Sequence, residues 1–181
     1  MKFTETNLKG VFVIELEKRG DDRGFFARLF CEREFAQHGL NPRIVQMNNS
    51  LSSQRGTLRG IHYQLRPKGE DKTFRCVRGA LYDVVIDLRQ ESPTFLQHVA
   101  VELTAENRKM IHVPQGCANS FMTLEDNTEI FYFTSEFYSP EHERGIRYND
   151  PALGIRWPME PLVISDKDTK HPDFKPETHL K

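Results

Sequence analysis

The sequence predicts an all-β fold in one domain, in the form of a sandwich, a barrel or a jelly roll. We count roughly eight short strand-like segments with turn residues between them, and almost no pattern of helical period. The 13 phenylalanines are many for a chain of 181 residues. They recur inside the strand-like segments, which favours a β-rich core. No internal repeat, low-complexity tract or linker interrupts residues 1–181, so a single domain is expected.

The expected strands are short runs of β-branched and aromatic residues bounded by turn residues. In chain order they are Val11–Leu16, Arg43–Asn49, Gly56–Gln64, Lys72–Val77, Ala80–Leu88, Val99–Leu103, Met110–Val113 and Glu129–Tyr138. Turns or loops are expected at Arg19–Gly24, Ser50–Gln54, Pro67–Asp71 and Pro114–Gly116. One short helix is expected at Arg33–His38, where Gly39 ends it. From Ser139 onward the periodic signals are few, so this part should wrap the outside with little regular structure.

Composition excludes several classes of function. The formal net charge is -1, and without a basic excess we expect no nucleic-acid partner, so any anion site must be a local cluster of Arg and Lys. The three cysteines are widely spaced and form no metal or redox motif, which suits a reduced, cytoplasmic setting. The first ten residues contain no apolar signal core, and no run approaches the ~20 apolar residues of a membrane span.

The segment Gly56–Gln64 is expected to be a strand that carries function. Regular alternation would put Arg59 and His62 on opposite faces. A bulge or twist at Gly60 would let the cation and the imidazole both reach one bound molecule, and a Gly inside a strand often marks such a bulge. The alternative is an ordinary half-exposed strand with a surface Arg and a His whose hydrogen bonds are satisfied.

Further polar residues that could serve chemistry lie on separate segments. They are Arg23, Gln46, Asn48, Lys72, Tyr132, Tyr138 and Asp168. A barrel gathers inward-facing residues of different strands around one cavity, so an anion-binding set and a proton-transfer set could meet there. Each residue also has a structural alternative: Tyr132 could belong to the core, and Asp168 could cap a helix or lie in a turn.

A metal centre is not expected. Zinc or iron would need a cluster of His, or His with a carboxylate. His62 is followed by Tyr63 and Gln64, so there is no His-x-His pair, and Asn119 stands where a metal-binding cupin would need a further His. No Cys or Ser stands in a nucleophile motif, and no cofactor is implied.

Many of these segments together resemble those of the dTDP-4-dehydrorhamnose 3,5-epimerases. The similar segments are Gly20–Phe26, Gln46–Ser50, Gly56–Gln64, Lys72–Gly79, Asp83–Arg89, Ser92–Phe95, Glu143–Arg147, Asp150–Pro151, Trp157–Pro158 and Ser165–Asp168, with Tyr132 and Tyr138 between them. The resemblance runs from about Gly20 to about Asp168, and its motifs are specific in combination.

The resemblance implies a metal-free cupin jelly roll that forms a homodimer with exchanged strands. It implies a nucleotide-linked 4-keto-6-deoxyhexose as substrate, whose C4 ketone acidifies the hydrogens on C3 and C5. A base removes one of these hydrogens, which leaves an enolate, and an acid on the opposite face returns a proton with inverted configuration.

The resemblance also implies a role for individual residues. His62 is similar to the family's base, with Asp168 orienting its imidazole and Asp166 a less favoured occupant of that place. Lys72 would stabilise the enolate oxygen, and Tyr132 would be the acid. The residues implied to hold the nucleotide, its phosphates and the sugar are Arg23, Gln46, Asn48, Arg59, Tyr138, Glu143 and Lys167.

Two positions depart from the family pattern within the implied binding site. Asn119 stands where the family usually has a His, and Arg28 where it usually has a Glu. An amide cannot titrate as an imidazole does, and Arg in place of Glu reverses a charge. These departures leave open the nucleotide, the sugar and the number of inverted carbons. A mono-epimerase, a keto-isomerase and a sugar-nucleotide binding protein without turnover therefore remain alternatives.

Overall fold

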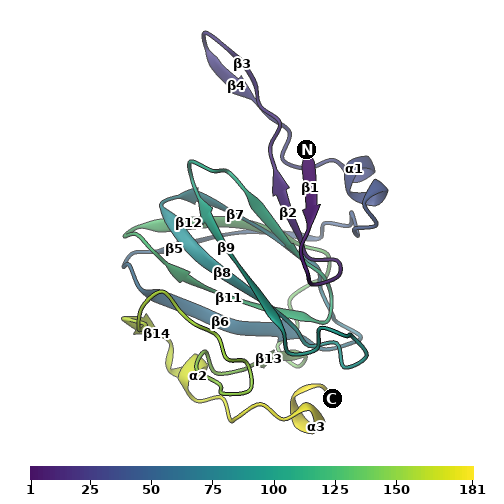
Figure 1. Ribbon diagram of the computed structural model, residues 1–181, viewed down its shortest axis with the longest axis vertical. Coiled ribbons are helices and arrows are strands. Elements are labelled where there is room, and N and C mark those ends of the chain that lie inside the picture. Colours follow the sequence, from purple (N-terminus) through teal and green to yellow (C-terminus); the bar gives the residue numbers. More distant parts are fainter.

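Two facing β-sheets form the body of the protein in a computed structural model that describes residues 1–181 (Figure 1). The first sheet has the order β1 (Lys2–Glu5), β2 (Phe12–Glu15), β10 (Met110–Val113), β7 (Lys72–Arg78), β12 (Thr128–Thr134) and β5 (Gln46–Ser52). The second has the order β13 (Glu143–Gly145), β6 (Thr57–Gln64), β11 (Cys117–Thr123), β8 (Ala80–Asp87) and β9 (His98–Thr104). A short strand, β14 (Val163–Ile164), runs parallel to β6. The other pairings of the two sheets are antiparallel, and the all-β, cupin-like jelly-roll class is confirmed.

Alternating side chains build the core between the two sheets. Val85 on β8 and Phe121 on β11 point inward and belong to the same buried cluster as Phe74 on β7. The outward residues of the second sheet are also buried, because the C-terminal part of the chain covers that face. Ile61, for example, packs in one cluster with Phe174. With both faces buried, β8 reads as a nearly continuous apolar run rather than an alternating one.

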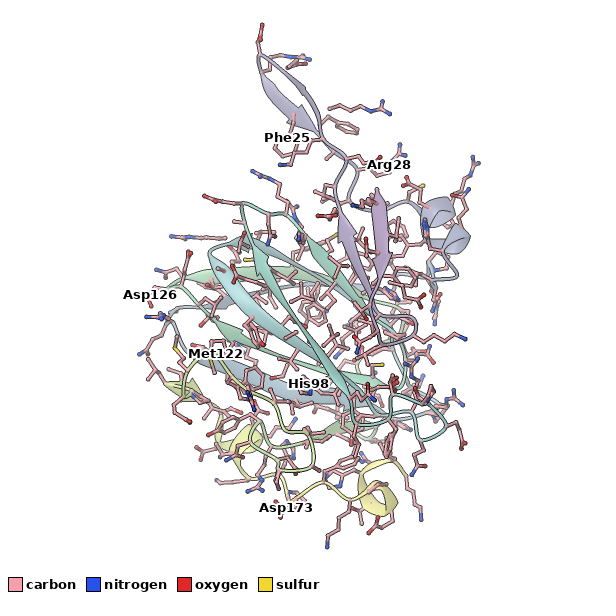
Figure 2. All side chains as sticks on the ribbon, viewed as in Figure 1. Phe25, Arg28, His98, Met122, Asp126 and Asp173 are labelled. Atoms are coloured by element: carbon pink, nitrogen blue, oxygen red, sulfur yellow. The ribbon has the colours of Figure 1, made fainter.

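Three short helices and one hairpin lie outside the sheets. The helices are α1 (Glu32–Gln37), α2 (Asp166–Thr169) and α3 (Pro176–His179). The hairpin consists of β3 (Arg19–Asp21) and β4 (Gly24–Phe26), and it projects away from the body of the protein (Figure 1). Figure 2 shows Phe25 on this hairpin and Arg28 close to its base, both remote from the space between the sheets.

Most expected elements are confirmed, and the differences have physical reasons. Strand β11 was not expected, because Cys117–Thr123 is rich in small and polar residues; it forms because β6 and β8 pair with both of its edges. The expected turn at Arg19–Gly24 contributes to the β3–β4 hairpin, and the expected loop at Ser50 belongs to β5, which pairs with β12 through Ser52. Strand β12 ends at Thr134, earlier than expected.

The expected bulge in β6 is present and lies at Gly60. Asn119 of β11 pairs with His62, but Phe121 pairs with Arg59, so two steps along β11 match three steps along β6. The extra residue resets the alternation and lets Arg59 and His62 line the same cavity. Gly60 has a φ of +112°, and a Cβ there would lie 2.8 Å from the Asn119 carbonyl oxygen. Glycine is therefore required at this position.

Replacing Gly60 by Ala should destabilise the fold by more than the ~1–3 kcal/mol that an unfavourable backbone conformation costs, because the new Cβ also meets the β11 backbone. The free energy of unfolding in urea measures this loss. Gly39→Ala is the matched control, since Gly39 also has a positive φ of +72° but has no atom within 4 Å of its added Cβ. Equal losses in the two variants would show that the close approach at Gly60 is not a constraint.

Candidate active site

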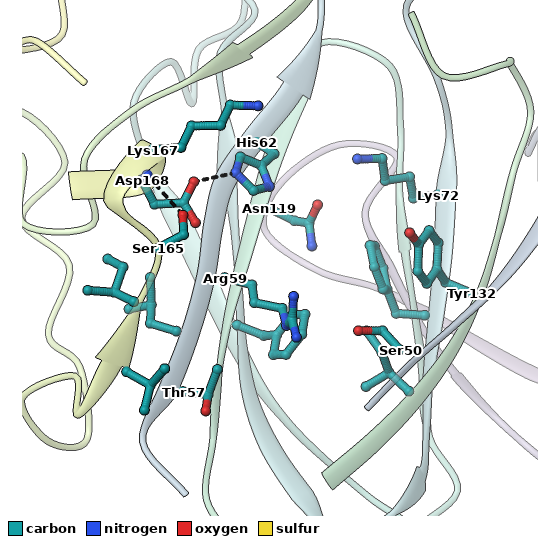
Figure 3. Close-up of a pocket in the computed structure, with 16 residues that line it drawn as sticks. Ser50, Thr57, Arg59, His62, Lys72, Asn119, Tyr132, Ser165, Lys167 and Asp168 are labelled. Carbon is teal, nitrogen blue, oxygen red and sulfur yellow. Dashed lines mark hydrogen bonds and ion pairs between the residues drawn. The ribbon is translucent and has the colours of Figure 1, made fainter. Parts of the chain in front are cut away.

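A cavity of about 460 Å³ lies between the two sheets and is the candidate active site, because seven of the residues predicted at the site line it (Figure 3). Its walls come from β5, β6, β7, β11 and β12 and from the segment 163–168. A second cavity of about 350 Å³ adjoins it and shares His62, Lys72 and Tyr132 with it. These three side chains therefore stand where the two cavities meet.

His62 is held by a buried carboxylate. Its Nε2 lies 2.7 Å from Oδ1 of Asp168, whose side chain is 5% exposed. Ser165 caps α2 by accepting a hydrogen bond from the Asp168 N–H, and the Gly60 N–H donates to Asp168 Oδ2. Burial by itself would raise the pKa of Asp168, but its hydrogen bond to His62 and the charge of that ring outweigh burial, so the pKa is lowered.

The pairing with Asp168 defines what His62 can do. An ionised carboxylate only accepts hydrogen bonds, so Nε2 of a neutral His62 carries the proton. The other ring nitrogen then has a free lone pair, and it points into the cavity (Figure 3). A histidine oriented in this way is suited to act as a general base.

Tyr132 and Lys72 occupy the opposite wall (Figure 3). The Tyr132 ring stacks on Phe74, with ring centroids 5.1 Å apart. Burial raises the pKa of the Tyr132 phenol, and the nearby charge of Glu70 raises it further. The phenol therefore stays protonated at neutral pH and can donate a proton or a hydrogen bond.

Lys72 is paired with a carboxylate that also borders the adjoining cavity. Lys72 Nζ lies 2.8 Å from Glu70 Oε1, and both side chains are largely buried. Burial raises the pKa of Glu70, although the charge of Lys72 opposes the shift. The pair holds the ammonium group beside Tyr132, where it can face negative charge that develops on a ligand.

A polar cluster forms the wall of the adjoining cavity. The Tyr138 hydroxyl donates to Glu143 Oε2 at 2.9 Å, and Lys167 forms an ion pair with the same oxygen. Burial would raise the pKa of Glu143, but the hydrogen bonds from Lys167 and Tyr138 outweigh it and lower the pKa. Gln46 accepts a hydrogen bond from the Tyr138 N–H, and Asn48 lines the same cavity.

Arg59 and Asn119 complete the larger cavity. The Arg59 guanidinium donates to Ser52 Oγ and to the Leu51 carbonyl oxygen, which anchors it at one end. Asn119 lies opposite His62 on the neighbouring strand, and in Figure 3 it stands between His62 and Lys72. Eleven of the thirteen residues expected at the site therefore line these two cavities.

Arg23 and Arg28 are the exceptions, because neither lines the two cavities within one chain. Arg23 lies on the β3–β4 hairpin, where its side chain is 89% exposed and pairs with Asp21. Arg28 pairs with Glu34 outside the two cavities. The hairpin extends away from the sheets and carries Arg23 with it, while Arg28 lies close to its base.

Sequence reasoning missed some residues of the site. Glu70 was placed in a loop, and no local pattern marks it as a partner of Lys72. Ser165 could have been found, because Ser165 and Asp168 match the Ser-x-x-Asp pattern of a helix start. Asp166 is exposed and pairs with Lys170, so it does not contact His62.

The fold and the cavity define a class of protein: a cupin-like jelly roll whose cavity presents a histidine paired with a carboxylate on one wall and a tyrosine beside a lysine on the other. No group of three or more His, Cys, Asp or Glu side chains is arranged to hold a metal ion. None of the helices has the length and apolar character needed to cross a membrane.

Comparison with known proteins identifies the family. The family model for dTDP-4-dehydrorhamnose 3,5-epimerase matches residues 5–176. The epimerase of that name from Sinorhizobium fredii is 44% identical over 175 residues, which cover 96% of this chain and 90% of that one. The chain therefore belongs to the dTDP-4-dehydrorhamnose 3,5-epimerase family, and it is an epimerase of the isomerase class.

Two solved structures are similar over nearly the whole chain. A Legionella pneumophila dTDP-6-deoxy-D-glucose-3,5-epimerase in complex with dTDP-4-keto-L-rhamnose has a TM-score of 0.86 and 37% identity, covering 92% of this chain and 89% of that chain. A 3'-monoepimerase from Streptomyces bikiniensis in complex with dTDP-quinovose has a TM-score of 0.85 and 37% identity, covering 93% and 85%. This chain is thus similar to enzymes that differ in the number of inverted carbons.

Asp168→Asn should slow exchange of substrate carbon-bound hydrogen with solvent by about 100-fold, since an amide cannot hold the imidazole in its basic tautomer as a carboxylate does. Nucleotide binding should change little. Exchange is followed by NMR in deuterated buffer. Asp166→Asn is the matched control, because Asp166 is two residues away and its side chain is 93% exposed. Wild-type exchange in Asp168→Asn would remove this carboxylate from the mechanism.

Proposed function

We propose that the chain inverts C3 and C5 of a dTDP-linked 4-keto-6-deoxyhexose, with His62 as base and Tyr132 as acid. The observation that carries this proposal is the position of the two groups on facing walls of one cavity, with the Lys72 ammonium beside the phenol. Inversion at carbon requires a proton to leave one face and another to arrive on the opposite face. Two groups on one wall could not do this.

Each inversion consists of two proton transfers. The free nitrogen of His62 takes the hydrogen from a carbon next to the ketone, and the electron pair of the broken C–H bond forms the enolate. The enolate oxygen carries the negative charge, which Lys72 stabilises electrostatically. Tyr132 then gives its proton to the opposite face of the same carbon, and the ketone re-forms. Solvent resets the acid and the base before the next inversion.

The adjoining cavity is the proposed nucleotide site. The exposed ring of Tyr138 offers a flat apolar face to a base, and Gln46 and Asn48 add amide groups beside it. Glu143 and Lys167 supply a paired acceptor and cation for the base and the sugar. Arg59 lies in the larger cavity, where its guanidinium can contact the phosphates or the hexose.

We further propose a homodimer in which the β3–β4 hairpin of one protomer completes the site of its partner. An isolated two-stranded hairpin is marginally stable in water. This one leaves Phe26 66% exposed and the Arg23 side chain 89% exposed. A second copy would cover the apolar ring, and it would receive the cation that is missing from the phosphate side of its cavity.

A cytoplasmic location is also proposed, since all three cysteines are free thiols and would be preserved in a reducing compartment.

Mono-epimerisation is the second candidate reaction. It is favoured by Asn119, which provides an amide instead of a second titratable group beside His62, and by the likeness to the 3'-monoepimerase. Deuterium at both C3 and C5 of the product would support double epimerisation, and deuterium at one carbon the alternative.

Exchange in deuterated buffer should separate the base from the acid. His62→Ala should abolish exchange at both carbons while dTDP still binds, because no other base reaches that face. Tyr132→Phe should keep exchange but slow formation of the inverted product by about 100-fold. Each variant is the control for the other. Exchange at the wild-type rate in His62→Ala, or full turnover in Tyr132→Phe, would contradict the assigned role.

Light scattering tests the proposed dimer. The wild-type protein should have twice the mass of one chain. The double variant Phe25→Ser/Phe26→Ser should shift toward monomer and lose most of its turnover, because the hairpin can no longer dock. Leu162→Ser is the control for mass, since Leu162 is similarly exposed but lies far along the chain from the hairpin. A monomeric wild-type protein with full turnover would contradict the exchange of hairpins.

A further inference from the structure

Gln64 is the last residue of β6 and is only 6% exposed, although it borders the adjoining cavity. Its amide binds the segment that carries Tyr138. Gln64 Oε1 accepts a hydrogen bond from the Ser139 N–H at 2.6 Å, and Gln64 Nε2 donates to the Phe137 carbonyl oxygen at 3.3 Å. One buried amide thus holds the residues on both sides of Tyr138.

The orientation of this amide is fixed by its partners. Nε2 also donates to the Lys68 carbonyl oxygen at 2.8 Å, so both of its hydrogens are used. Carbonyl oxygens only accept and the Ser139 N–H only donates, so a flipped amide would lose all three hydrogen bonds. Gln64 therefore has no hydrogen left to donate to a ligand, and we expect it to act through the chain that it holds.

The segment around Tyr138 has little other support. Phe137, Tyr138 and Ser139 belong to no helix or strand, and Tyr138 is 57% exposed. A ring with so little packing is placed mainly by its backbone and by its hydroxyl. The Tyr138 N–H donates to Gln46 Oε1, so a second side-chain amide fixes the same backbone.

Gln64 also fixes the partner of the Tyr138 hydroxyl. That hydroxyl donates to Glu143 Oε2 at 2.9 Å, and Glu143 lies directly opposite Gln64 in the antiparallel pairing of β6 with β13. The side chain of Gln64 thus holds the backbone of Tyr138, and its main chain pairs with the residue that holds the hydroxyl. Both ends of Tyr138 are therefore tied to one position of β6, two residues after His62.

We propose that Gln64 is a positioning residue that holds the Tyr138 ring where the base of the nucleotide stacks on it. This inference rests on the proposed nucleotide site and adds a residue to it. A ring that is fixed before binding loses less conformational freedom when the ligand arrives, so the affinity for the nucleotide is higher. Gln64 itself gives the base no hydrogen bond and acts through Tyr138.

Gln64→Met keeps the length of the side chain and removes both the donor and the acceptor. It should raise the calorimetric Kd for dTDP about 10-fold, because the loosened segment must then be ordered during binding. The KM for dTDP-4-keto-6-deoxyglucose should rise similarly. At saturation kcat should stay within about twofold of the wild-type value, because bound substrate has already ordered Tyr138 before the proton transfers.

Asn107→Leu is the matched control. The Asn107 amide also binds one carbonyl oxygen, of Glu102, and two backbone N–H groups, of Thr104 and Lys109, but it braces the turn between β9 and β10 and lines neither cavity. This variant should lose stability in urea without a change in the Kd for dTDP. A purely structural role for Gln64 would give the same result, since a variant that is fully folded in buffer would keep the wild-type Kd and KM.

Tyr138→Ala, alone and combined with Gln64→Met, tests whether Gln64 acts through the ring. If it does, the double variant should bind dTDP no more weakly than Tyr138→Ala. A further loss in the double variant would show that Gln64 acts on the ligand by another route and would overturn the positioning role. An unchanged Kd in Gln64→Met would overturn it as well.

Amide hydrogen exchange gives a measurement that needs no variant. In the wild-type protein without ligand, the Ser139 N–H should be protected at least about 10-fold more than the Glu141 N–H, after correction for intrinsic rates. The Glu141 N–H donates no hydrogen bond in the structure, whereas the Ser139 N–H donates to Gln64. Equal protection would show that the segment is not held before binding, and it would refute the proposal even if Gln64→Met did not fold.

Failure of this inference and failure of the proposed function give different results. If the wild-type protein binds dTDP without turnover, the proposed epimerisation fails and the comparison of Kd values still decides the role of Gln64. If the wild-type protein does not bind dTDP, the proposed nucleotide site is wrong and this inference falls with it. Normal binding and turnover with an unchanged Kd in Gln64→Met would remove this inference alone.

Discussion

The bulge at Gly60 is the constraint on which the rest of the site depends. A regular strand would turn Arg59 and His62 to opposite faces, one into the cavity and one into the covered outer face. One extra residue in β6 brings both into the cavity, and the same backbone places the Gly60 N–H against the carboxylate of Asp168. The close approach of β11 leaves no room for a side chain at this point. A local backbone irregularity thus brings together the Arg59 cation, the His62 imidazole and the Asp168 carboxylate that pairs with this imidazole.

Burial and pairing then assign different protonation states to neighbouring groups. Asp168 is buried but receives hydrogen bonds, so its pKa is lowered and it remains an anion beside His62. Tyr132 is buried near a negative charge, so its pKa is raised and it remains a proton donor. Asp83 is fully buried in the core, and burial raises its pKa to about 8. Two carboxyl groups with the same ordinary pKa, Asp168 and Asp83, are therefore shifted in opposite directions by their surroundings.

The two adjoining cavities differ in the side chains that line them. Arg59, Asp168 and Lys167 line the larger one, the exposed Tyr138 ring and Glu143 line the smaller one, and His62 and Tyr132 line both. They meet at His62, Lys72 and Tyr132. Arg23 adds no positive charge to either cavity of its own chain, because it lies on the β3–β4 hairpin, which projects away from the two sheets.

The amino-acid sequence was enough to predict the β-rich class, the family, the bulge at Gly60 and eleven of the residues that line the two cavities. These follow from local pattern: strand periodicity, a glycine inside a strand, and motifs that are specific in combination. Only the tertiary structure decided what those patterns cannot encode. It showed that β11 is a strand because two neighbours pair with it, and that Lys72 is held by Glu70. It also left Arg23 and Arg28 outside the cavity and Asp83 without a partner. Pairing, burial and the direction of a hairpin depend on residues far apart in the chain, so no local window of sequence contains them.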